Sequence, residues 1–221
     1  MPEQPIQKFI LRATYVERDR LAMLSHLEVA HALERTVRRA GLPFAISKGF
    51  SPHMKIAFGA ALPVGVGSTC EIFDVQLTRY VPEDQALVAL RQASVPDLMV
   101  QEVHYIDPHA KAASVAYPIS VYRVEFSQPV FELAVPDEIV RIRRKKQKTF
   151  RVADHLIAPI AFEDEGHCIA TFSLEAHDDG ALRADLFMSE CLKLHNASLA
   201  AGKEPLRALN ITRVAQRAAK E

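Results

Sequence analysis

The chain has 221 residues, and its 27 lysines and arginines are balanced by 27 aspartates and glutamates, so the formal net charge at pH 7 is zero. A hydrophobic fraction of 49% is typical of a folded protein and excludes a disordered chain. The length suits one large domain or two small ones. Because the charges balance, no overall field draws the protein to nucleic acid, and any such binding depends on local clusters of cations.

The first residues and the cysteines indicate the compartment. The segment MPEQPIQKFILRATYVERD has no long apolar run, and no apolar stretch reaches the roughly 20 residues that span a bilayer. Cys70, Cys168 and Cys191 are odd in number, widely spaced, and without CxxC or CxxxCxxC spacing. We therefore expect a reduced, cytoplasmic protein that binds no membrane and holds no iron–sulfur cluster.

In the N-terminal half, apolar spacing predicts the order strand, helix, three strands, helix and strand. We expect strands at 9–16, 43–48, 54–61, 70–79 and 100–106, and helices at 26–40 and 83–93. This βα–βββ–αβ order fits a ferredoxin-like α+β sandwich with one additional strand. We therefore expect an N-terminal ferredoxin-like domain over residues 1–106.

The helix expected at 26–40 has clear start and stop signals. Ser25 and Glu28 have the spacing of a capping box, and Gly41 is the expected left-handed stop. An apolar face recurs at three- and four-residue steps: Leu27, Ala30, Leu33, Val37 and Ala40. Cations lie toward the other side of the helix: Arg35, Arg38 and Arg39.

A shaped loop follows the helix in the segment GFSPHMK, residues 49–55. Gly49 permits positive φ, and Pro52 holds Ser51 in an extended conformation. The loop presents Lys48, Ser51, His53 and Lys55, and cations beside a glycine turn suit a phosphate. The alternative is a tight connection between strands whose histidine and lysines are simply solvated.

Residues 8–80 resemble the radical-SAM-linked domain family. That family occurs as a separate protein or fused to the C-terminus of radical SAM proteins that carry a cobalamin-binding-type domain. The matching features are Ser25-His26-Leu27, Glu34-Arg35, Arg38 to Pro43, Gly49-Phe50, Pro52-His53, Pro63 with Gly65, and Glu71 with Asp74. The chain departs from the pattern at Glu28, Ser51 and Met54. The resemblance implies a bacterial accessory of a radical SAM enzyme, with RNA as the substrate, and it supplies no catalytic residue.

The C-terminal half predicts a second copy of the layout. Residues 107–117 are small and polar, as in a linker, and we expect a second ferredoxin-like domain over 118–221. Its expected elements are strands at 119–126, 149–152, 157–163, 167–176 and 208–214, and helices at 137–146 and 183–195. The fold class is thus two ferredoxin-like sandwiches in tandem. The alternative is one continuous sheet in which the second half packs against the first.

A run of cations occupies the end of the helix expected at 137–146: Arg141, Arg143, Arg144, Lys145, Lys146 and Lys148. Some of these charges suit a helix C-terminus, but the run exceeds that need. It predicts a surface that binds RNA or an acidic protein. No RNP1, KH or zinc-finger motif is present in the sequence, so we expect recognition of the RNA backbone and shape.

Residues for metal or acid–base chemistry are sparse. None of the nine histidines has HxH, HxxxH or HExxH spacing, so we expect no metal site and no cofactor. Glu71 and Asp74 lie three apart in a strand and therefore on opposite faces, which excludes a carboxylate dyad. One of them is expected to pair with the basic helix.

The sequence thus predicts a non-catalytic protein that binds RNA and docks on a radical SAM enzyme, in RNA modification or maturation. One alternative is a metal-independent endoribonuclease, with His53 as general acid or base and Lys55 stabilising phosphate charge. Another is an adaptor that binds only proteins.

Overall fold

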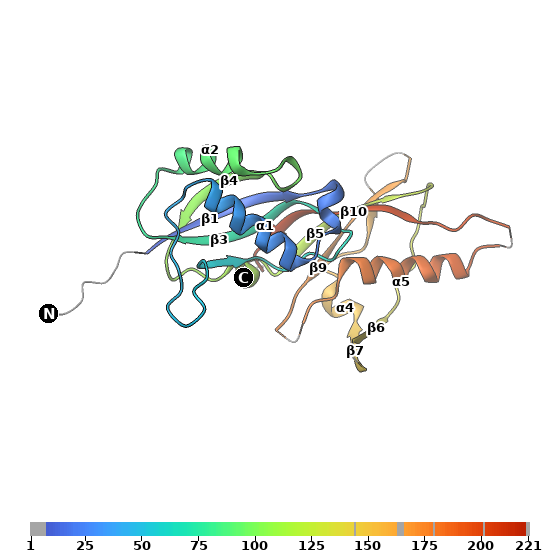
Figure 1. Cartoon of the computed structure of the whole chain (residues 1–221). Helices are drawn as coiled ribbons and strands as arrows, with labels where there is room; N and C mark the ends of the chain where they lie inside the picture. Colours follow the sequence, from blue (N-terminus) through green and yellow to red (C-terminus); the bar gives the residue numbers. More distant parts are fainter. Residues whose placement is uncertain (1–7, 144, 163–165, 179, 201, 220–221) are drawn as a thin grey trace. The chain divides into compact units, whose positions relative to one another are not determined.

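The structure is a computed structural model that describes residues 8–143, 145–162, 166–178, 180–200 and 202–219. The chain has an α+β fold and divides into two compact units (Figure 1). Unit 1 comprises Met1–Val64 and Ser68–Ala116, and unit 2 comprises Gly65–Gly67 and Tyr117–Glu221.

Unit 1 contains the elements β1 (Phe9–Glu17), α1 (His26–Arg39), β2 (Ile56–Phe58), β3 (Gly67–Leu77), α2 (Glu83–Ala93) and β4 (Val100–Ile106). Two 3-10 helices, η1 (Asp19–Met23) and η2 (Pro96–Leu98), connect them. The strands lie in the order β4–β1–β3–β2, and every pairing is antiparallel. This is the split βαβ order of a ferredoxin-like unit. The strand expected at 43–48 forms only isolated bridges, at Phe44 and Ile46.

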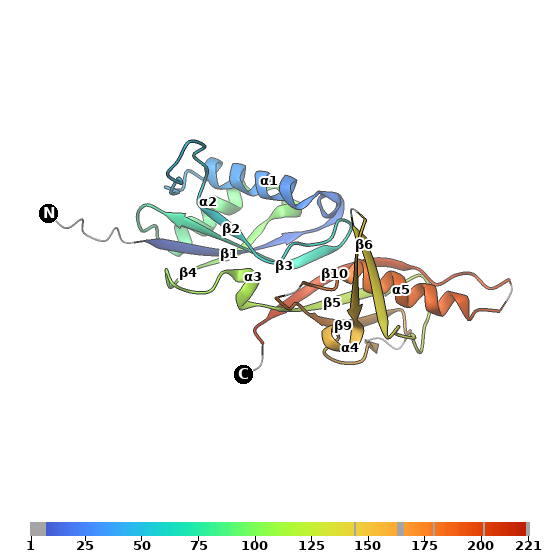
Figure 2. The same ribbon diagram turned by 90° about the horizontal axis from the view of Figure 1, so that it is seen from below.

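Helices α1 and α2 cover one face of the unit 1 sheet, and α3 (Ala113–Ala116) lies on the other face (Figure 2). Leu33 and Val37 of α1 pack with Phe73 and Val75 of β3 in a core that solvent does not reach. Since these side chains recur at helical spacing in α1 and at alternate positions in β3, each element buries one face. The residues expected to form a linker thus include α3, whose Ala113 is buried.

The face of the sheet beneath α3 carries a buried ion pair. Arg12 of β1 lies directly opposite Asp74 of β3, and its guanidinium donates to both carboxylate oxygens, at 2.7 and 2.8 Å. The Arg12 side chain also donates to the carbonyl of Lys111, at 3.3 Å. Asp74 therefore pairs with the neighbouring strand and not with the basic helix, and the expected pairing with that helix stays a prediction for Glu71.

Helix α1 confirms the capping box. The Ser25 N–H donates to the Glu28 carboxylate at 2.8 Å, and the Glu28 N–H donates to Ser25 Oγ at 3.4 Å. Gly41 has φ 67°, as its role as helix stop requires. The expected burial of Leu27 is wrong, because its side chain is 69% exposed, and Val29 takes a place in the core instead.

Unit 2 contains four strands in antiparallel pairing and one long helix. The strands β5 (Ile119–Phe126), β8 (Ala161–Phe162), β9 (Ile169–Glu175) and β10 (Ala208–Arg217) lie in the order β10–β5–β9–β8. Helix α5 (Ala184–Ala197) packs its Phe187 ring against Phe172 of β9, with ring centres 5.0 Å apart. Phe172 also stacks on Tyr122 of β5, at 5.3 Å.

The prediction of a helix at 137–146 is wrong. The segment forms a two-stranded hairpin, β6 (Glu138–Arg143) and β7 (Lys146–Arg151), and the four-residue helix α4 (Val152–His155) follows. Isoleucine and valine alternate with arginine in this segment, and β-branched residues at period two favour a strand over a helix. Two complete ferredoxin-like sandwiches in tandem are therefore not shown, because the hairpin stands where the first helix of the second sandwich was expected.

Candidate functional site

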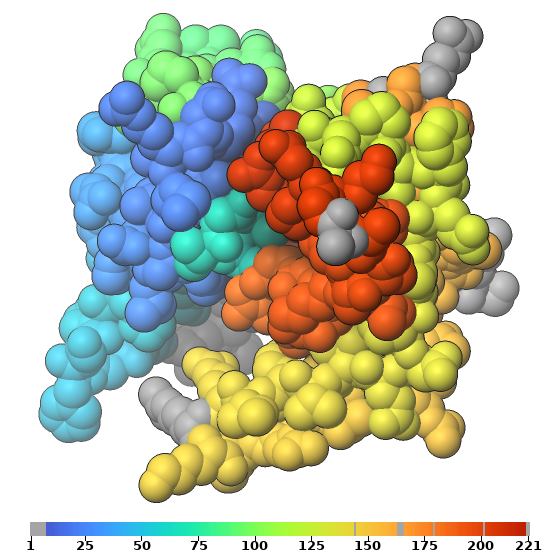
Figure 3. All heavy atoms as spheres, turned by 90° about the vertical axis from the view of Figure 1, so that its right-hand side faces the viewer, coloured from blue at the N-terminus to red at the C-terminus, as the bar shows by residue number. Residues whose placement is uncertain are grey.

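A basic hairpin projects from unit 2. Its register runs from Glu138 opposite Arg151 to Arg143 opposite Lys146, and Figure 3 shows it as the yellow segment at the lower edge of the view. Side chains alternate between the faces of a strand, and residues directly opposite one another share a face. The register therefore places four of the predicted cations on one face: Arg141, Arg143, Lys146 and Lys148.

The ring of Phe150 lies on this same face. The guanidinium carbon of Arg141 is 5.0 Å from the ring centre, and the Lys148 ammonium is 4.8 Å from it. Phe150 is buried and lies opposite Ile139, which is also buried. One end of the face thus packs into unit 2, and the other end presents cations to solvent.

These cations face one another in like-charged pairs, Arg141 with Lys148 and Arg143 with Lys146. Like charges directly opposite in a hairpin destabilise it, by roughly 0.2–1 kcal/mol per pair. In the described part of the chain, no carboxylate lies within salt-bridge distance of Arg143 or Lys146. Because a bound anion removes this repulsion, the arrangement favours a ligand that carries phosphate or carboxylate groups.

The turn of the hairpin carries further charge. Lys145 has φ 66°, a conformation that glycine or asparagine adopts more readily than lysine. Backbone geometry therefore does not explain a lysine here, whereas an anion-binding surface does. Arg144, also predicted to bind phosphate, lies outside the described residues.

A pair of histidines adjoins the buried end of the hairpin. The His155 ring lies 5.4 Å from the Phe150 ring and 5.0 Å from that of His177, measured between centres. His155 Nδ1 is 2.9 Å from the Glu175 carbonyl, and His177 Nε2 is 2.7 Å from the Asp154 carbonyl. Since a carbonyl oxygen only accepts, each of these nitrogens carries a proton. His155 and His177 are distant in sequence, and their spacing did not predict that their rings lie together.

The predicted loop in unit 1 is closed by Ser47 and His53. The Ser47 N–H donates to the His53 carbonyl at 2.8 Å, and the His53 N–H donates to Ser47 Oγ at 3.1 Å. His53 Nδ1 lies 2.9 Å from Ser47 Oγ and 3.2 Å from the Ser51 carbonyl. The histidine therefore holds the loop in shape, a role that the sequence did not indicate. Its role as an acid or base stays a prediction.

The cations of unit 1 differ in their surroundings. Arg39 donates to the Ala93 carbonyl at 2.7 Å and so satisfies the C-terminal turn of α2. The guanidinium of Arg38 lies 4.9 Å from the centre of the Phe44 ring. Arg35, Lys48 and Lys55 are exposed, the first on α1 and the others beside the loop. Of the predicted cations in this unit, Arg39 thus has a structural partner in the fold.

Glu28 shows how a local contact tunes a carboxylate beside this surface. The Ser25 hydroxyl, and then the Ser25 backbone N–H, lower the pKa of Glu28 because both donate to its ionised form. The negative charge at this end of α1 thus strengthens the cap, and it also complements the helix dipole.

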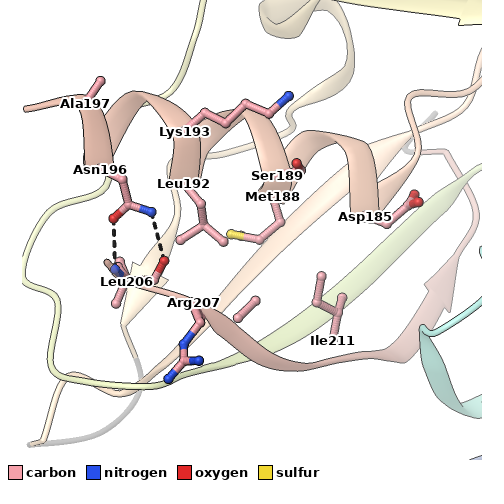
Figure 4. A pocket seen from close by; sticks show the side chains of 11 residues that line it. Asp185, Met188, Ser189, Leu192, Lys193, Asn196, Ala197, Leu206, Arg207 and Ile211 are labelled. Carbon is pink, nitrogen blue, oxygen red and sulfur yellow. Dashed lines mark hydrogen bonds between the residues drawn. The ribbon is translucent and has the colours of Figure 1, made fainter. Parts of the chain in front are cut away.

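An open hollow of about 680 Å³ lies between α5 and β10 (Figure 4). Met188, Leu192 and Ile211 make its lining mostly apolar. The Asn196 amide closes one end, because it donates to the Leu206 carbonyl at 3.0 Å and accepts from the Leu206 N–H at 2.8 Å. In the described residues, no group of three histidine, cysteine or acidic side chains is placed to hold a metal ion. Charged side chains also line the hollow, namely Asp185, Lys193 and Arg207.

Two comparisons with known proteins bear on the chain. A family model described as an uncharacterised protein conserved in bacteria, DUF2344, matches residues 11–184, which include α1, the unit 1 loop and the hairpin. No curated protein matches the chain. No helix among the described residues is both long enough and apolar enough to cross a membrane.

Proposed function

The chain belongs to the DUF2344 family of bacterial proteins, and on that premise we propose that it is a non-catalytic RNA-binding protein that docks on a radical SAM enzyme. The basic hairpin of unit 2 is the RNA contact, and the partner enzyme carries out the chemistry in RNA modification or maturation. The protein works in the cytoplasm.

The observation that carries this proposal is the pair of like-charged partners on one hairpin face. Arg143 lies directly opposite Lys146, and this repulsion weakens the free hairpin, so a bound polyanion relieves the repulsion in addition to making its own contacts. RNA presents phosphates in a regular row, which suits cations spaced along two strands. The contacts address phosphates, so they give affinity without a base code.

The radical SAM partner is supported by the resemblance of residues 8–80 to domains linked to such enzymes. The strand order β10–β5–β9–β8 of unit 2, which corresponds to β4–β1–β3–β2 of unit 1, supports an underlying tandem ferredoxin-like plan in which the hairpin takes the place of a helix. Binding through the hairpin leaves the unit 1 surface, including Lys48, Ser51 and Lys55, for the substrate or the enzyme.

Binding of the purified chain to transfer RNA and ribosomal RNA fragments, followed by fluorescence anisotropy across a salt series, tests the proposal. With about four phosphate contacts, the logarithm of the affinity should fall against the logarithm of salt with a slope of about −3 to −4. Intact RNA on a gel of the same samples is expected, because the chain is proposed to bind and not to cleave.

No binding at about 50 mM salt would overturn the proposal in favour of the protein-binding adaptor, since phosphate contacts are strongest at low salt. Cleaved RNA would overturn the non-catalytic part, provided that His53→Ala abolishes cleavage while RNA binding remains.

A further inference from the structure

Phe50 is the most unusual exposed side chain of the unit 1 loop. It lies at the loop tip with 112% relative exposure, more than in an extended reference chain. A phenylalanine ring in water forgoes the burial that usually stabilises this residue. Scattered exposed apolar residues need no explanation, but this one stands on a loop whose shape is fixed.

Hydrogen bonds close the base of the loop that carries Phe50. Ser47 and His53 close its base through two backbone-donated hydrogen bonds and the contact of the histidine ring with the serine hydroxyl. Gly49, next to the ring, has φ 139°, a conformation that other residues rarely adopt. The backbone of such a closed loop loses little conformational entropy on binding.

The chemistry around Phe50 favours a nucleobase over an apolar pocket of a protein. Lys48 precedes the tip in the chain and Lys55 follows it, and both are exposed, as is Ser51, the next residue after Phe50. An apolar pocket would have to desolvate these charges without compensation, whereas an RNA strand supplies phosphates for the lysines and a base face for the ring.

We propose that Phe50 is a stacking platform for an unpaired RNA base, with Lys48 and Lys55 on the flanking phosphates. In a duplex both faces of each base are covered by neighbouring pairs, so only a loop, bulge or single-stranded end can place a base on the ring. This inference deepens the proposed RNA binding and rests on it, because it names the class of RNA: one with unpaired nucleotides.

The test compares Phe50→Ala with the wild type on two RNAs of equal length, one single-stranded and one fully paired. Stacking contributes about 1–3 kcal/mol per base, so the variant should bind the single strand about 5- to 150-fold more weakly. Binding of the duplex should not change. Phe50→Trp should retain the wild-type affinity, since a larger aromatic ring also stacks. Phe131→Ala, which removes another largely exposed phenylalanine, is the matched control and should leave both affinities unchanged.

A spectroscopic measurement identifies the contact itself. A single strand with 2-aminopurine at one position should lose fluorescence when the wild type binds, because stacking on an aromatic ring quenches this base. The quenching should be absent with Phe50→Ala at concentrations that saturate the variant. Because the ring is fully exposed, the urea concentration at the midpoint of unfolding should stay as in the wild type.

Unchanged binding of the single strand by Phe50→Ala overturns the inference while the RNA-binding proposal stands. If that variant instead loses its complex with the radical SAM enzyme, the ring is a protein contact. Conversely, loss of single-strand binding in Phe50→Ala alongside wild-type binding in Arg143→Gln/Lys146→Gln supports the stacking platform and removes the hairpin from the RNA contact.

Discussion

The double variant Arg143→Gln/Lys146→Gln replaces both members of one like-charged pair. It separates the effect of these cations on the stability of the hairpin from their effect on RNA binding. The two side chains lie directly opposite each other at the outer end of the cationic face, and both are exposed. Glutamine keeps much of their length and removes their charge. In the free protein the change relieves repulsion, so the free energy of unfolding should stay level or rise by up to about 1 kcal/mol.

RNA binding should change in the opposite direction. Two lost phosphate contacts reduce the steepness of the salt dependence by about 1.4 for single strands and about 1.8 for duplexes. Between about 50 and 200 mM salt, the wild type should therefore lose about 7- to 12-fold more affinity than the variant loses. Anisotropy titrations give the affinities, and urea unfolding of the same samples gives the stability.

Arg183→Gln/Lys193→Gln is the matched control. It removes the same number of cations from unit 2, but these two already pair with Asp185 and Glu190, each through a contact of 2.6 Å. The control should leave the salt dependence as in the wild type. Loss of more than about 1 kcal/mol of stability in the hairpin variant would refute the reasoning, because the cations would then support the fold. An unchanged salt slope would also refute it.

Three further predictions concern the fold. Arg12→Met should cost about 3–5 kcal/mol by denaturant unfolding because it leaves the Asp74 carboxylate buried without its main partner, and Arg12→Met/Asp74→Leu should recover much of that loss. Equal losses in the two variants would contradict this. Ser25→Ala should raise the pKa of Glu28, which NMR titration measures. In the wild type, the cap stabilises the fold fully above the ordinary carboxyl pKa, and this stabilisation is lost as the pH falls through the lowered pKa of Glu28. An unchanged pKa in the variant would count against the cap. Burial raises the pKa of the Cys191 thiol to about 12, so it should resist alkylation near pH 8 until the protein unfolds, and labelling as fast as the other two cysteines would exclude that burial.

The elements of unit 1 could be predicted because their signals are local. Ser25 and Glu28 are three residues apart, and Gly41 ends the helix that they begin. A short stretch of sequence therefore specifies both ends of α1. What contacts the surface of that helix is not local. Arg39 reaches the Ala93 carbonyl at the end of α2, a contact that no spacing within the helix reveals.

The hairpin was mistaken for a helix because its start resembles one. Pro136 and Asp137 are common at the first turn of a helix, and the cations that follow suit a helix end. The alternation of Ile139, Arg141 and Arg143 with Val140 and Ile142 is the signal that decides for a strand. Greater weight on that period would have predicted the hairpin, although not the ring contact between His155 and His177.

The features that make the hairpin unfavourable as plain structure occur together in this one segment. It occupies the place of the expected helix, it places Arg143 opposite Lys146, and its turn holds Lys145 at positive φ. The last two features lower stability and neither contributes to the core, whereas Ile139 and Phe150 anchor the segment at its base. Where local preference and stability are overridden in an otherwise consistent fold, a ligand is the usual reason. We therefore expect RNA phosphates to neutralise the cations that repel one another in the free protein.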